Sequence, residues 1–190
     1  MSEVSSVALV RSRSTVLRRS IAVTAGVVLV AISAHIAIPI PGTPVPMTLQ
    51  PLAVLLVGGA LGAALGGSTL VLYLTLGIAG LPVFSPLGGP GGIASIIGTS
   101  GGFLLAFPLA GATTGRIVGN GQSTVRVAAG ALAGLVLIYL GGLAQLAILT
   151  GSVRAAATLG TLPFIIGDIC KLAIAVASLR LLTPSLRARL

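Results

Sequence analysis

The chain has 190 residues, of which 55% are hydrophobic and only 7% are charged, and its formal net charge is +9. A soluble domain carries about 25% charged residues, so this chain cannot cover a globular surface with polar groups, and we expect a membrane protein. The positive charge does not indicate nucleic-acid binding. Such binding needs a basic face with aromatic residues, whereas this chain has long apolar blocks and no Trp.

The N-terminal residues 1–20 are basic and precede the apolar run Ile21–Ile38. This order is also found in secretory signal peptides. The run is long for such a signal, and no clean small-residue cleavage site follows it, so we interpret it as a retained first span. Four prolines follow within Pro39–Pro46, where they exclude a helix and favour an extended loop.

Five further apolar runs predict five further spans. They are Met47–Leu65, Ser68–Ile78, Gly101–Val118, Val125–Thr150 and Leu162–Leu182. Gly66 and Gly67 are interpreted as a tight turn between the second and third spans, and the third is short for a full crossing. The Gly/Pro-rich segment Val83–Ile97 is expected to pack over the protein as a loop.

The distribution of arginine predicts the orientation. With the N-terminus inside, nine arginines fall on inner segments and only Arg154 falls on an outer one. The inner ones are Arg11, Arg13, Arg18, Arg19, Arg116, Arg126, Arg180, Arg187 and Arg189. We therefore expect an all-α cell-membrane protein with six transmembrane helices, both termini in the cytoplasm, and outer loops that cap an outward-facing pocket. The helices form one domain, 21–182, between a basic tail of residues 1–20 and another of residues 183–190.

The last span contains an acid and a base. Asp168 and Glu3 are the only acidic residues of the chain, and Lys171 is its only lysine. A charge at the centre of a spanning helix costs about 2.5–3.5 kcal/mol, so such residues pair or mark a substrate path. Residues i and i+3 share a helix face, and a lysine side chain that leans toward the helix N-terminus reaches the level of Asp168. We interpret the pair as the core of a ligand site. The alternative is that the two side chains only bridge each other.

Small residues recur at four-residue spacing in three spans, a pattern that allows helix backbones to approach closely in lipid. They are Gly58, Gly62 and Gly66, then Gly130 and Gly134, then Ala22 and Gly26. Internal packing explains each set. A surface for another membrane subunit is the alternative, and it is best placed at Ala22 and Gly26 near the inner end of the first span.

The sequence lacks the residues needed for ATP hydrolysis, metal binding and catalysis by paired carboxylates. There is no P-loop, because the only lysine follows Cys170, so ATP hydrolysis by this chain is not expected. No His/Cys/Asp/Glu cluster predicts a metal site, and one interior acid cannot form a catalytic carboxylate pair. We expect no enzyme and no cofactor. The lone His35 is assigned a hydrogen bond near the outer end of the first span, and the lone Cys170 a role in packing.

Four strings resemble the BioY family of biotin transporters, over about Ile21–Leu182. The first joins Ile38-Pro39 to PVPMTLQPLAVLL from Pro44 onward. The others are GLPVF from Gly80, GTSGGFLLAFPLA from Gly98 and PFIIGDICK from Pro163. Each string alone is weakly specific, but their combination is specific.

The resemblance implies the substrate-binding S component of an energy-coupling factor (ECF) transporter, which captures biotin with high affinity. It implies partners, namely a transmembrane T component and two cytosolic ATPases, besides the lipid bilayer. The family motif D-x-x-K maps onto Asp168 and Lys171. Where members often have Tyr after Gly-Gly, this chain has Phe103. The implied docking site for the T component lies in the first span, at Ala22 and Gly26.

Biotin combines a ureido group, an apolar ring and a carboxylate. An ionised Asp168 accepts hydrogen bonds from ureido N–H groups, and Lys171 donates to a ligand oxygen while neutralising Asp168. The remaining candidates for the pocket wall are Gln50, Thr48, Tyr73, Ser100 and Phe103.

Other functions stay open at this point. An S component for another vitamin has the same architecture, and a membrane assembly subunit without a ligand explains the apolar spans equally well. An intramembrane enzyme lacks a nucleophile and base. Homo-oligomer formation is also left open by the sequence.

Overall fold

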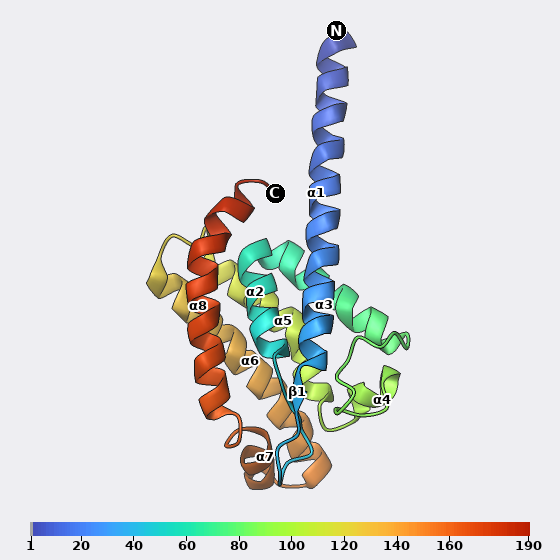
Figure 1. Cartoon of the computed structure of the whole chain (residues 1–190), viewed down its shortest axis with the longest axis vertical. Coiled ribbons are helices and arrows are strands. Elements are labelled where there is room, and N and C mark those ends of the chain that lie inside the picture. Colours follow the sequence, from blue (N-terminus) through green and yellow to red (C-terminus); the bar gives the residue numbers. More distant parts are fainter. Residues whose placement is uncertain (1) are drawn as a thin grey trace.

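A computed structural model describes the backbone of residues 2–190 and the side chains of residues 15–190. The described chain consists mostly of helices packed side by side (Figure 1). The long helices are α1 Ser2–His35, α5 Gly101–Val118, α6 Thr124–Thr150 and α8 Ile165–Arg187. The shorter ones are α2 Gln50–Leu61, α3 Ala63–Ile78, α4 Gly92–Ile97 and α7 Val153–Gly160.

The proline-rich segment forms a small hairpin. The strands β1 Ala37–Ile38 and β2 Met47–Thr48 pair antiparallel, with Ala37 opposite Thr48. The loop between them carries four prolines, which remove backbone donors and fix extended backbone angles. The extended loop expected here is therefore present. The first helix ends at His35, three residues before the predicted end at Ile38.

The turn predicted at Gly66-Gly67 is wrong. The helices α2 and α3 are separated at Gly62, whose φ of +88° lies in a region that favours glycine. Gly66 and Gly67 both lie inside α3. A Cβ atom at Gly66 would lie 2.8 Å from the Cα atom of Gly58, so this glycine allows a close backbone approach.

Two segments outside the six predicted spans contain helices of their own. The short helix α4 occupies the end of the Gly/Pro-rich segment, and α7 lies between α6 and α8. Ser152 initiates α7 by accepting a hydrogen bond from the backbone N–H of Ala155 at 3.2 Å. The last helix also runs beyond the predicted Leu182, with Pro184 inside it.

Close packing inside the bundle explains most of the small-residue pattern. Helix α5 lies against α6, α3 and α2. A Cβ atom at Gly58 would lie 2.6 Å from the Cα atom of Gly111, and one at Gly134 would lie 2.6 Å from Leu55 Cδ2. The internal-packing interpretation of these glycines is therefore confirmed.

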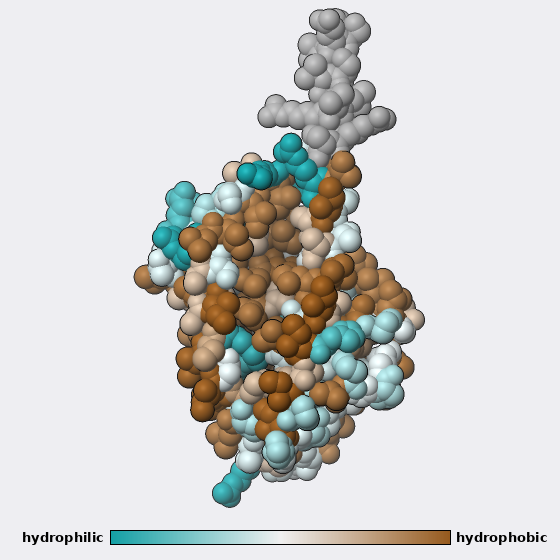
Figure 2. Space-filling model, viewed as in Figure 1, coloured by the Kyte–Doolittle hydropathy of each residue, from teal (hydrophilic) through white to brown (hydrophobic). Residues whose placement is uncertain are grey.

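The outside of the bundle is apolar. Hydrophobic residues cover most of the middle of the face in Figure 2. Within the part of the chain that the structure describes, three helices are long and apolar enough to cross a membrane: α1 from Thr15, α5 and α6. The pair α7 and α8, bent by 60°, supplies a fourth if it forms one span. Helices α2 and α3 have only 12 and 16 residues, so the predicted six crossings go beyond this finding.

Both chain termini lie toward one end of the bundle, which we call the terminal end (Figure 1). The hairpin, α4 and α7 lie toward the other, which we call the pocket end.

Candidate functional site

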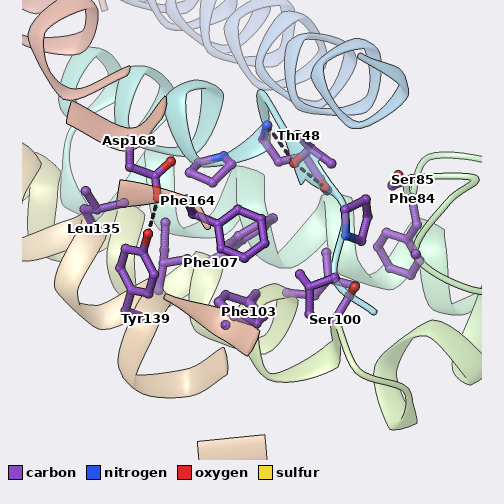
Figure 3. A pocket seen from close by; sticks show the side chains of 18 of the residues that line it. Thr48, Phe84, Ser85, Ser100, Phe103, Phe107, Leu135, Tyr139, Phe164 and Asp168 are labelled. Carbon is purple, nitrogen blue, oxygen red and sulfur yellow. Dashed lines mark hydrogen bonds between the residues drawn. The ribbon is translucent and has the colours of Figure 1, made fainter. Parts of the chain in front are cut away.

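A pocket opens at the pocket end, between the hairpin, the segment around α4, and helices α5, α6 and α8 (Figure 3). Its space is about 690 Å³, the open mouth included. Its lining residues are Val45, Pro46, Thr48, Gln50, Pro51, Phe84, Ser85, Gly88, Ser95, Ser100, Phe103, Leu104, Phe107, Leu135, Ile138, Tyr139, Gly160, Phe164, Asp168 and Lys171. Six of the seven predicted binding residues are among them.

The acid and the base of α8 form a buried ion pair on the pocket wall. Lys171 Nζ lies 2.7 Å from Asp168 Oδ1, and each residue is 6% exposed. The i,i+3 spacing and the inclination of helical side chains toward the N-terminus produce this contact. The predicted pairing of these two residues is confirmed, and both also face a cavity.

Tyr139 of α6 completes this polar end of the pocket. Its hydroxyl donates a hydrogen bond to Asp168 Oδ2 (Figure 3). Asp168 thus receives one donor on each carboxylate oxygen, which compensates a charge held out of water. The sequence prediction missed Tyr139. The sequence did contain a clue to Tyr139: it is one of only two tyrosines, and it is a polar group within a long apolar run.

A second polar network begins at β2. Thr48 Oγ1 donates to Gln50 Oε1 at 3.1 Å, and Gln50 Nε2 donates to the Tyr73 hydroxyl at 2.7 Å. The Tyr73 hydroxyl donates in turn to the carbonyl of Val83 at 2.9 Å. Thr48 and Gln50 line the pocket, whereas Tyr73 does not. Tyr73 therefore holds Gln50 from behind and is not a wall residue.

Aromatic rings form the apolar walls. Phe103, Phe107 and Phe164 lie between the labelled polar groups in Figure 3. The ring of Phe103 meets Tyr139 edge-on, with centroids 6.5 Å apart. An apolar surface of this kind suits the hydrocarbon part of a small ligand.

The far side of the pocket carries the serines Ser85, Ser95 and Ser100. Ser85 and Ser100 lie across the cavity from Asp168 in Figure 3. The hydroxyls of Ser95 and Ser100 are buried and have no hydrogen-bond partner among the described residues. The prediction included Ser100 but not Ser95.

Two threonines attach the hairpin loop to its surroundings. Thr43 Oγ1 donates to the carbonyl of Leu159 in α7 at 2.7 Å, and Thr99 Oγ1 donates to the carbonyl of Pro44 at 3.4 Å. Val45 and Pro46 of the same loop line the pocket. The hairpin loop is thus part of the pocket wall and is joined to both of its sides.

The remaining predicted residues lie away from this pocket. Gly26 is buried, and a Cβ atom there would lie 2.8 Å from Thr69 Cγ2, whereas Ala22 is half-buried. His35 is exposed, and its Nδ1 lies 2.9 Å from the carbonyl oxygen of Ala31, one turn earlier in the same helix. Cys170 is exposed, so its predicted packing role is wrong: it lies on the side of α8 opposite the core.

Comparisons with known proteins give a consistent result. A family model described as the BioY family matches residues 5–188. A probable biotin transporter BioY of Pyrococcus horikoshii is 44% identical over 150 residues, covering 79% of this chain and 86% of the relative. The biotin transporter BioY of Thermotoga maritima is 35% identical over 147 residues, covering 77% and 85%.

A solved structure has the same fold. It is a crystal structure of the S-component for biotin from an ECF-type ABC transporter. The TM-score is 0.75 at 26% sequence identity, and the match covers 90% of each chain.

Proposed function

Because this chain belongs to the BioY family, we propose that the pocket beside Asp168 is its biotin site. The chain takes up biotin across the cell membrane as the substrate-binding S component of an ECF-type transporter. The observation that carries the site is the ion pair of Asp168 and Lys171, which is buried and at the same time lines a cavity.

The ion pair matches the ureido group of biotin. Asp168 keeps free lone pairs after accepting from Lys171 and Tyr139, so it accepts the ureido N–H groups. Lys171 has three donors and gives only one to Asp168, so it donates another to a ligand oxygen. Because the two charges cancel, this end favours a neutral polar group with donors and an acceptor.

The other walls complete the site. Gln50 and Thr48 contribute polar atoms near the hairpin, and Phe103 contributes apolar surface for the biotin rings. Ser100 lines the opposite side. Tyr73 acts indirectly, by fixing the Gln50 amide through its hydroxyl.

The full arrangement in the membrane is also proposed. Six crossings, with α2 and α3 as short ones, place both termini in the cytoplasm and the hairpin, α4 and α7 outside. A transmembrane T component and two cytosolic ATPases supply the driving force. We place the T component on the face of α1 around the half-buried Ala22, because Gly26 is occupied by its contacts with α3.

The test removes each charge without changing size greatly. Asp168→Asn and Lys171→Met should each weaken biotin binding to the purified protein at least about tenfold, since each loses charge-assisted hydrogen bonds. Arg154→Met, which changes an exposed charge on α7, is the control and should leave affinity unchanged. Normal biotin affinity in both folded pocket variants would reject the site.

The same protein preparation tests two alternatives. A ligand that binds the native state raises its unfolding temperature. Biotin should stabilise the protein, whereas other vitamins should not. Stabilisation by a different vitamin alone would indicate an S component of other specificity, and no stabilisation by any compound would favour an assembly subunit.

A further inference from the structure

Two serine hydroxyls stand without a partner at the side of the pocket away from the ion pair. Ser95 is 2% exposed, and the Oγ atoms of Ser95 and Ser100 are buried with no hydrogen bond within the described part of the chain. Both residues line the pocket. Buried polar groups in folded proteins nearly always have a partner, so two such hydroxyls on one cavity indicate a group supplied by a ligand.

The surroundings of these hydroxyls are suited to an anion. Both approach the glycine backbone beside α4, because a Cβ atom at Gly88 would lie 3.3 Å from Ser100 Oγ and one at Gly89 would lie 3.5 Å from Ser95 Oγ. Ser100 is also the N-cap residue of the 18-residue helix α5, yet its side chain makes no capping bond. The N-terminus of a helix carries partial positive charge that favours negative groups.

The two ends of the pocket therefore differ in electrostatic character. At one end the carboxylate of Asp168 would repel a second carboxylate, although Lys171 offsets its charge. At the serine end no acidic residue is present, because the only other acid of the chain is Glu3. The groups available to a ligand at the serine end are hydroxyl donors and the N-terminus of α5, both of which favour an anion.

We propose that Ser95 and Ser100 bind the carboxylate of biotin and so determine the preference for the free acid. This assignment rests on the proposed function, in which the ureido group lies at Asp168 and Lys171. Each serine donates its hydroxyl hydrogen to a carboxylate oxygen. The apolar walls formed by Phe103 and Phe107 then enclose the part of the ligand between its two polar ends.

The test compares biotin with biotinamide, in which the carboxylate is replaced by a neutral amide. Equilibrium binding to the purified full chain in detergent should show tighter binding of biotin. Ser95→Ala and Ser100→Ala should each weaken biotin binding about tenfold, the effect of one hydrogen bond to a charged group, and change biotinamide binding much less. Unfolding temperatures without ligand should stay unchanged, because neither hydroxyl bonds to the protein.

Thr183→Val is the matched control. Its hydroxyl is also buried and unpartnered, but Thr183 does not line the pocket, so both affinities should be unaffected. Serine variants that bind both compounds like the wild type would overturn the proposal, and so would an equal loss for both compounds. Failure of the wild type to bind biotin, or normal binding by both Asp168→Asn and Lys171→Met, would instead overturn the proposed function.

Discussion

At the scale of single residues, the polar end of the pocket is a set of three mutually dependent side chains. Lys171 and Tyr139 each donate to a different oxygen of Asp168. Removing one partner of a buried pair leaves an uncompensated charge, which destabilises far more than the intact pair stabilises. The geometry of the Asp168 carboxylate therefore depends on Tyr139 as well as on Lys171, and a ligand that binds this carboxylate depends on all three.

Tyr139→Phe isolates the contribution of the hydroxyl, because the ring and its contact with Phe103 remain. We expect biotin affinity to fall about three- to tenfold, since one oxygen of Asp168 loses its donor and its orientation. Equilibrium binding measures the change. Thr150→Val is the control, because it removes a hydroxyl from the same helix that bonds only to nearby backbone. Equal biotin affinity in Tyr139→Phe and the wild type would show that the hydroxyl does not position the carboxylate.

The sequence singled out Asp168 and Lys171 because charges are rare in lipid and therefore informative, and both residues line the pocket. Gln50, Thr48, Ser100 and Phe103, which the sequence also suggested, line the same pocket. Ser95 was not among the residues suggested by the sequence, because nothing in the sequence shows that its hydroxyl is buried without a partner. Tyr73 was placed in the wall because the sequence cannot distinguish a residue that lines a cavity from one behind it.

At the scale of the elements, α8 connects the pocket to the terminal end of the bundle. It carries the ion pair near its start and Arg187 at its last residue. Arg187 Nη2 donates to the carbonyls of Gly59 at 2.7 Å and Gly115 at 2.9 Å. These carbonyls lie in the last turns of α2 and α5, where helices leave acceptors unsatisfied. One planar guanidinium with several donors therefore joins the ends of three helices.

Arg187→Lys should lower the stability of the ligand-free protein, because a lysine cannot reproduce the forked contacts with two helices. We expect a loss of about 1–3 kcal/mol, from one or two hydrogen bonds with a charged donor. Thermal unfolding in detergent would show it as a lower midpoint. Arg189→Lys changes an exposed arginine two residues later and should leave the midpoint unchanged. If the midpoint of Arg187→Lys is also unchanged, the hydrogen bonds of Arg187 to Gly59 and Gly115 contribute nothing to stability.

The elements themselves were predicted with unequal success. Long apolar runs gave α5 and α6 almost to the residue, since the demand for internal hydrogen bonds in lipid leaves helix as the natural structure. The turn at Gly62 was misplaced at Gly66-Gly67 because glycine serves both for positive φ and for close helix contact. The helices α4 and α7 were missed because each has fewer than nine residues, too few for periodicity to be visible.

At the scale of the whole molecule, the two ends of the bundle differ in their cations. The first turn of α6 and the C-terminal half of α8 carry arginines that donate to backbone carbonyls, such as Arg126 to Ile117 and Arg180 to Gly121. The pocket end has the exposed Arg154 on α7. Because loops rich in arginine remain in the cytoplasm, this asymmetry supports the proposed orientation, in which the pocket faces the outside.

Labelling of single cysteines tests this orientation. In a Cys170→Ser background, Thr158→Cys places an exposed thiol on α7, and Asn120→Cys places one in the turn between α5 and α6. A membrane-impermeant maleimide added to intact cells should label Thr158→Cys at once and Asn120→Cys only after permeabilisation. The reverse pattern would direct the pocket to the cytosol. If both positions are labelled from outside, they lie on the same side of the membrane. This result would contradict the proposal, because a single crossing between positions 120 and 158 places them on opposite sides. Between these two positions lie α6 and the first residues of the short helix α7, so the experiment also tests whether α6 spans the membrane once.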